Sequence, residues 1–200
     1  EIPPQETGLT YNSWYGKPHL EMHWWHGVHF PLWGRPELLE KSLPWYDRVF
    51  KKAKNLAGRQ GFKGARWQKM TDPYGDEGPS SVGAFLLWQQ PHFITYAELM
   101  YRADSTSATL EKYKERVFAT ADFMASFAHL NEEGTYDLGP GVIPAQERFP
   151  KMETFNPTYE LAYWNWALTT ALKWKERLGE EQPEEWKKVA ENLSPLPIQE

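Results

Sequence analysis

Residues 156–168 read NPTYELAYWNWAL, and this stretch decides the fold class because apolar and aromatic side chains run nearly all round it. Asn156 and Pro157 are typical of a helix start, as a cap followed by a first-turn proline. Residues 20–33, LEMHWWHGVHFPLW, have the same character. A helix without a solvated stripe is buried on both sides. The two stretches therefore predict inner helices of a layered all-α domain.

Four further helices are expected around these two. Proline opens one at residue 36, which should run to about residue 57, and Pro91 precedes another that should end near residue 102. Apolar positions at helical spacing predict a helix over residues 107–130. The last is expected over residues 183–193, before a Pro-rich tail that cannot continue it. No segment convincingly predicts a strand.

The links between these helices alternate in length. Short links are expected at residues 34–35, 103–106 and 179–182, and long ones at residues 58–90 and 131–156. Consecutive helices should therefore form three hairpins, with the helices at 36, 107 and 183 in an outer layer. The long loops would then emerge on one face, and loops of this length are usually functional. We expect residues 1–200 to form a single domain.

The composition favours a carbohydrate ligand over several other classes. The chain has 11 Trp and 16% aromatic residues, and Trp suits half-wet clefts where sugar C–H groups stack. A Trp-rich core explains the same numbers equally well, and the tryptophans at helix ends or on outer helices are expected to be structural, namely Trp33, Trp45, Trp174 and Trp186. The net charge of −5 and the scattered cations argue against nucleic acid. No window of about 18 apolar residues predicts a membrane span. With no Cys, no thiolate chemistry is expected.

Three blocks together resemble the catalytic barrel of the six-hairpin, helical-toroid glycosidases, the superfamily of maltose phosphorylases and α-fucosidases. They are GFKGARW at 61–67 with the acids of 72–77, WQQPH at 88–92, and VIPAQE at 142–147 followed by FNPTY at 155–159. The resemblance implies a partial (α/α) toroid of about three hairpins, a portion of an (α/α)6 barrel. Gln146 stands where the maltose-phosphorylase group has a carboxylate, and the base of the hydrolytic relatives lies in a later hairpin.

The resemblance assigns Glu147 as the general acid. Pro144, Phe149 and Phe155 flank it, and an apolar setting would raise its pKa as acid catalysis requires. The plainer interpretation is a solvated loop glutamate paired with Arg148. Glu77 is the candidate for a second catalytic carboxyl, although a turn rich in Asp and Gly is usually only a turn.

Side chains of the long loops and inner helix starts are expected to bind the sugar through ring stacking and hydroxyl contacts. The candidates are Trp14, Glu21, His23, Trp24, His26, Arg66, Trp67, Lys69, Asp76, Gln89, Gln90 and His92. Histidines three and four residues apart at 19, 23 and 26 would permit a zinc site, but no zinc signature is present. We predict no metal and no cofactor, and expect the buried histidines to bond to neighbours or sugar hydroxyls.

These features predict a glycoside hydrolase that uses Glu147 and water, with inversion favoured. A sugar isomerase or epimerase is the first alternative, with a histidine as the essential base. A non-catalytic sugar-binding fragment is the second, because half a ring lacks the base. Open inner helices should expose an apolar wall, covered by the rest of a larger chain or in a homodimer. The resemblance implies a periplasmic or secreted protein, although residues 1–4 have no signal-peptide character.

Overall fold

The computed structural model describes residues 17–197, and its secondary structure is mostly helical, at 54% helix. Its longer helices follow the predicted order, and none of the helices in this part of the chain is long and apolar enough to cross a membrane. The helices are α1 (Leu20–Gly27), α2 (His29–Leu32), α3 (Pro36–Glu40), α4 (Pro44–Arg59), the 3₁₀ turn η2 (Gly83–Phe85), α5 (His92–Ala103), α6 (Ser107–Phe127), α7 (Thr158–Arg177) and α8 (Glu184–Glu191).

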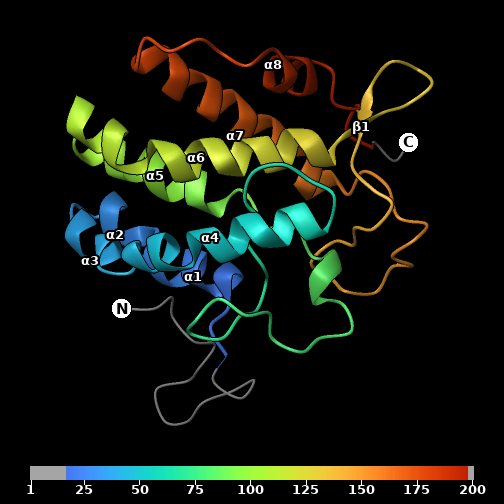
Figure 1. Ribbon diagram of the computed structural model, residues 1–200, viewed down its shortest axis with the longest axis horizontal. Coiled ribbons are helices and arrows are strands. Elements are labelled where there is room, and N and C mark those ends of the chain that lie inside the picture. Colours follow the sequence, from blue (N-terminus) through green and yellow to red (C-terminus); the bar gives the residue numbers. More distant parts are fainter. Residues whose placement is uncertain (1–16, 198–200) are drawn as a thin grey trace.

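The helices form two layers, as Figure 1 shows, and this confirms the predicted partial α/α toroid. The inner layer is α1, α5 and α7, since α5 packs against both of the others. The outer layer is α4, α6 and α8, with α6 in the middle. Consecutive inner and outer helices pair as hairpins, most closely in α5–α6 and α7–α8. The alternation of inner and outer helices is therefore confirmed.

The first two predicted helices are each broken in two, and proline explains both breaks. Proline lacks the N–H that would donate to the carbonyl four residues earlier, and its ring clashes with that carbonyl. Pro31 lies four residues after Gly27, where α1 ends, and Pro44 lies four residues after Glu40, where α3 ends. The predictions of unbroken helices over residues 20–33 and 36–57 were wrong at these two points.

A small hairpin replaces the end of the predicted helix over residues 107–130. The helix α6 ends at Phe127, and β1 (His129–Leu130) then pairs antiparallel with β2 (Tyr136–Asp137). The Asn131 side chain accepts hydrogen bonds from the backbone N–H groups of Glu133 and Thr135 at 3.0 Å, which closes the turn. The expectation of no strand was wrong, because local side-chain bonds of this kind leave little periodic signal.

Both long loops lie at one end of the molecule and the short links at the other, as the alternation predicted (Figure 1). The first loop is anchored over the outer layer through Ala65, whose backbone N–H donates to Ala119 O of α6 at 2.8 Å. Gly64 permits this approach, because a Cβ there would lie 2.0 Å from that same oxygen and its φ is +68°. The loop is thereby fixed against α6.

Four tryptophans fill the core, and each indole N–H has a partner. They are Trp45 to Pro73 O, Trp164 to Met124 O and Trp174 to Glu98 Oε2, each at 2.9 Å, and Trp186 to Asp122 Oδ1 at 3.0 Å. Three of them, Trp45, Trp174 and Trp186, were expected to be structural, and this is confirmed. The same expectation for Trp33 was wrong, since its side chain is 76% exposed on the open edge of the inner layer.

Candidate functional site

Three charged side chains from distant parts of the chain meet at the N-terminal end of α1. Lys69 Nζ lies 2.7 Å from Glu147 Oε1 and 3.3 Å from Glu21 Oε1. Glu21 comes from the first turn of α1, Lys69 from the loop after α4, and Glu147 from the loop before α7. The structure therefore brings together three of the residues predicted from the sequence.

Glu147 is held in an unusual backbone conformation, with φ +60° in the left-handed region. Such a conformation costs a non-glycine residue free energy and is often found at functional sites. Its side chain is 38% exposed, and Phe149 and Phe155 beside it are also exposed. The expected apolar setting was wrong. Its carboxylate pairs with Lys69, whereas the plainer interpretation had predicted a pair with Arg148.

Lys69 is largely enclosed, with a side chain 13% exposed, compared with 9% for Glu21 and 38% for Glu147. Burial alone would lower the pKa of its ammonium group, but the ion pairs with Glu147 and Glu21 outweigh burial and raise that pKa. Lys69 is therefore charged at neutral pH and holds the two carboxylates on either side of it.

An aromatic cluster lies next to the trio and joins all three inner helices. Trp24 of α1 lies 6.2 Å from the ring of His92, the first residue of α5. Trp88 lies 5.7 Å from His92 and 6.2 Å from Tyr159, and Tyr163 lies 5.6 Å from His92, all between ring centroids. Glu21 and Trp24 are three residues apart on α1, so the trio and the aromatic cluster share one face.

His92 is enclosed in this cluster and electrically neutral. Its Nδ1 lies 3.0 Å from the Tyr163 hydroxyl, which lies 2.5 Å from Thr95 Oγ1. Burial lowers the pKa of His92 well below its usual value. The other ring nitrogen, Nε2, is buried without a hydrogen-bond partner among the described residues.

Glu160 is a buried carboxyl that the sequence analysis missed. It lies in the first turn of α7 and is 1% exposed, and burial raises its pKa to about 7. Helical spacing could have revealed it, because Glu160 precedes the buried Trp164 by one turn and so shares the inward face of α7.

Four of the predicted sugar contacts, Arg66, Trp67, Gln89 and Gln90, build the base of the loop and are turned into the protein, although Gln89 Oε1 keeps no partner among the described residues. Arg66 donates to the carbonyls of Trp67 and Leu86 and to Gln90 Oε1. Gln90 also binds Ala65 O and Trp67 N, and Gln89 Nε2 donates to Leu86 O at 2.9 Å. Trp67 is buried, with its N–H on Thr120 Oγ1 at 2.8 Å. The side chains of Arg66, Gln89 and Gln90 donate hydrogen bonds to backbone carbonyls of the loop, which has few backbone–backbone hydrogen bonds of its own.

The histidines of α1 divide between core and surface. His23 is buried, with Nδ1 at 3.0 Å from the Tyr46 hydroxyl and Nε2 at 2.6 Å from Ser42 Oγ, so both ring nitrogens are satisfied. Burial lowers its pKa to about 3. His23 therefore packs the core, and its predicted sugar contact was wrong. His26 is exposed, and within residues 17–197 no group of His, Asp or Glu is arranged to hold a metal ion.

The second predicted carboxyl cluster lies on an exposed turn. Asp76 pairs with Lys52 of the outer helix α4 at 2.7 Å, and its sugar contact stays a prediction. Asp72 Oδ1 accepts from the backbone N–H groups of Tyr74 and Asp76 at 2.8 Å, as the turn interpretation predicted. Glu77 is exposed on the same turn, and its catalytic role stays a prediction. Trp14 lies outside the described residues.

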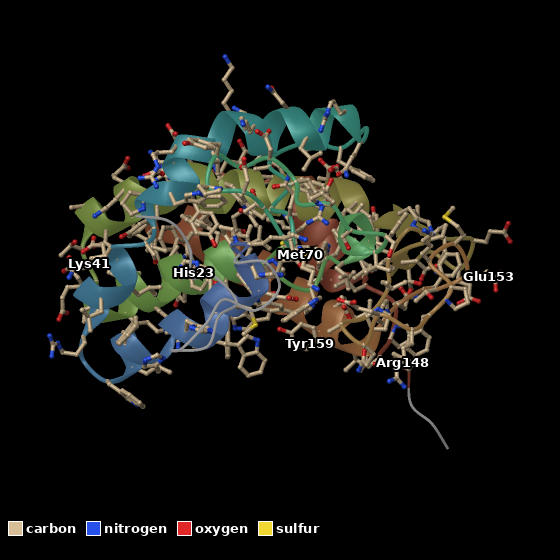
Figure 2. The ribbon with its side chains drawn as sticks, turned by 90° about the horizontal axis from the view of Figure 1, so that it is seen from below. His23, Lys41, Met70, Arg148, Glu153 and Tyr159 are labelled. Atoms are coloured by element: carbon tan, nitrogen blue, oxygen red, sulfur yellow. The ribbon has the colours of Figure 1, made fainter. Side chains whose placement is uncertain are left out.

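Figure 2 shows how the site is placed along the molecule. Lys41, between α3 and α4, and Glu153, in the long loop before α7, mark opposite ends. Tyr159 lies between His23 and Arg148 along this length, so the aromatic cluster is central and the Glu147 loop extends toward the Glu153 end.

Comparison with known proteins supports the fold. No family model and no curated protein matches the chain. Among solved structures, a protein described as a kojibiose phosphorylase from the human microbiome superposes with a TM-score of 0.72 at 12% identity. The match covers 96% of this chain and 27% of that chain. The chain thus has the fold of part of an α/α toroid, and it spans about a quarter of the length of this carbohydrate-active neighbour.

Proposed function

We propose that the chain forms the acid-bearing, sugar-binding wall of an enzyme that cleaves a glycosidic bond, with Glu147 as general acid. The observation that carries this proposal is the convergence of Glu21, Lys69 and Glu147 beside the aromatic cluster of the inner helices. A carboxyl next to sugar-stacking rings is the arrangement that acid-catalysed glycoside cleavage needs. The similarity of fold to a kojibiose phosphorylase supports the same class of chemistry.

In this proposal the Glu147 side chain leaves Lys69 and contacts the substrate in its place. At rest the Glu147 side chain is held by its ion pair with Lys69 at 2.7 Å. When a sugar enters, Glu147 leaves Lys69, takes up a proton and presents it to the departing glycosidic oxygen. Lys69 keeps Glu21 as its partner throughout, so no buried ammonium is left unpaired. The aromatic rings of Trp24 and Tyr159 stack on the C–H faces of the sugar.

Water is our proposed attacking group, with inversion, and Glu77 remains the candidate base. The direct alternative is inorganic phosphate, because the similar structure is described as a phosphorylase. Isomerisation of a sugar is a different reaction. The observation that favours it is His92 Nε2, which is buried without a hydrogen-bond partner among the described residues. His23 no longer supports it, since both its ring nitrogens are engaged in the core.

The test is turnover of a panel of oligosaccharides and alkyl glycosides, whose leaving groups need protonation, by the wild type, Glu147→Gln and Glu153→Gln. Loss of the acid should reduce kcat by about 10²- to 10⁴-fold. Glu153→Gln, an exposed carboxyl of the same loop, is the matched control and should keep wild-type rates. Parallel reactions with and without inorganic phosphate identify the attacking group from the product, a free sugar or a sugar phosphate.

Three outcomes would contradict the proposal. Full activity of Glu147→Gln would remove the acid assignment. Aldose–ketose interconversion that dies with His92→Gln but survives Glu147→Gln would establish the isomerase. Sugar binding without any turnover would make the chain a binding module.

A further inference from the structure

Several buried polar atoms at the starts of α5 and α7 have no hydrogen-bond partner within the described residues. They are Trp88 Nε1, Gln89 Oε1, His92 Nε2 and both carboxyl oxygens of Glu160. Native proteins satisfy about nine in ten of their buried polar groups, so a concentration of exceptions needs an explanation. A ligand, or water that a ligand displaces, supplies one.

These groups belong to one neighbourhood. Trp88 lies edge-on to both His92 and Tyr159, at 5.7 and 6.2 Å between ring centroids. Glu160 is the next residue after Tyr159, and its charge contributes to raising the pKa of the Tyr159 phenol. Gln89 follows Trp88 directly and fixes the loop through its amide N–H groups, which leaves its oxygen available.

The unsatisfied groups include an obligate donor and several acceptors. The indole N–H of Trp88 needs an acceptor, whereas the oxygens of Gln89 and of an ionised Glu160 need donors. A sugar hydroxyl both donates and accepts, so adjacent hydroxyls of one ring match the mixture. The rings of Trp88 and Tyr159 offer the stacking surface that the C–H face of such a ligand requires.

An anionic sugar fits this neighbourhood poorly. Glu160 would repel a uronate or a phosphate placed beside it. The two enclosed cations of the long loop before α5 are already engaged, Lys69 by two carboxylates and Arg66 by backbone carbonyls and Gln90. His92 is neutral and adds no positive charge.

We propose that Trp88, Gln89, His92 and Glu160 form a subsite for one uncharged sugar ring, and that Glu160 makes the subsite selective against uronates and sugar phosphates. The subsite deepens the proposed function and rests on it for its place in the reaction. Tyr159, half exposed and in contact with Trp88, covers the buried atoms and swings aside when the sugar enters.

The experiment is calorimetric titration at pH 8.5, above the raised pKa of Glu160, so that its carboxylate is charged. The 200-residue chain is titrated with glucose, galactose, mannose, xylose, glucuronate, galacturonate and glucose 1-phosphate. At least one neutral sugar should bind, and its uronate or phosphate counterpart should bind at least tenfold more weakly. Trp88→Phe keeps the ring and removes the N–H, and should weaken binding of the neutral sugar about fivefold. Glu160→Gln should keep that binding and reduce the discrimination against the anionic sugars.

Matched variants separate the subsite from a general structural effect. Trp25→Phe, at an exposed tryptophan of α1, and Glu153→Gln, at an exposed loop carboxyl, should leave affinity and discrimination unchanged. Tyr163→Phe, which loses the hydroxyl that bonds His92, gives a second independent variant if Trp88→Phe does not fold.

The subsite and the proposed function fail in different ways. Equal or tighter binding of uronates, unchanged discrimination in Glu160→Gln, or no binding of any neutral sugar overturns the subsite. Turnover that depends on Glu147 would still stand in each of these cases. Conversely, selective binding that persists in an inactive chain supports the subsite and rejects catalysis by this chain alone.

Discussion

At the scale of single residues, the buried carboxyls of α5 and α7 have opposite surroundings. Glu98 of α5 accepts from both arms of Arg177, from Arg102 and from the Trp174 indole, and these bonds outweigh burial and lower its pKa. Glu160 of α7 has no such partner, and burial raises its pKa to about 7. One carboxyl therefore favours the ionised form in the folded state, and the other the protonated form.

The raised pKa of Glu160 predicts a loss of stability with rising pH. The ordinary glutamate pKa is 4.5 and the folded value about 7, so the folded state keeps the proton more tightly. The stabilising contribution is full below pH 4.5 and is lost as the pH rises through 7. Each pKa unit corresponds to about 1.4 kcal/mol, so the loss should reach about 3 kcal/mol. Glu160→Gln should remove it, as urea unfolding between pH 4 and 9 would show.

The control for this pH dependence is Glu153→Gln, which changes an exposed carboxyl and should leave the wild-type slope intact. Should Glu160→Gln retain that slope, another group would be responsible for it and Glu160 would already have a partner in solution.

Sequence reasoning placed the right residue types at this site but could not orient every side chain. Glu21, Lys69 and Glu147 meet as expected because they lie at helix starts or in loops on one face. Arg66 and Gln90 come from the same segments but point inward, because the loop backbone needs hydrogen-bond partners. That demand depends on tertiary packing, which residue spacing alone does not report.

At the scale of helices, Glu98 ties α5 to α7. Both arms of Arg177 and the indole of Trp174 reach it from α7, at 2.6–3.2 Å. Glu98→Gln would leave the guanidinium of Arg177 without its counter-charge at a largely buried site. The free energy of unfolding at pH 7 should fall by about 3 kcal/mol, measured by urea denaturation.

Arg102→Gln provides the comparison, because Arg102 pairs with the same carboxylate from an exposed position on α5 itself. It should cost under about 1 kcal/mol. Equal costs for the two variants would show that the link between α5 and α7 contributes little. Acid should reduce the cost of Glu98→Gln, since a carboxyl with a lowered folded pKa loses its stabilising effect as the pH falls.

The positions of helices were predictable because apolar periodicity and link length are local signals. The helix breaks at residues 28 and 41–43 could also have been predicted, because Pro31 and Pro44 each lie four residues after a helix end. The hairpin of β1 and β2 could not be predicted, because it depends on side-chain hydrogen bonds of Asn131 and on the parallel β-bridge between Tyr136 and Leu193.

At the scale of the whole molecule, the alternation of short and long links between helices determines the arrangement of the hairpins. It requires hairpins with all long loops at one end, and the structure has this arrangement (Figure 1). The same alternation does not predict which side chains of the two long loops are in contact, because each loop spans tens of residues. The toroid was therefore predictable and the precise site was not.

The open edge of the inner layer leads to a last prediction, that this chain self-associates. Trp25, Leu32 and Trp33 of the α1–α2 segment are 61%, 67% and 76% exposed. Contiguous exposed apolar side chains on a folded domain mark an interaction surface. We expect sedimentation equilibrium to show a dimer of the wild type, and Trp25→Ser with Trp33→Ser to shift it to monomer. Tyr74→Ser, equally exposed but on the loop turn, should leave the dimer intact. A wild type that is monomeric at every concentration would instead favour cover by further hairpins of a longer chain.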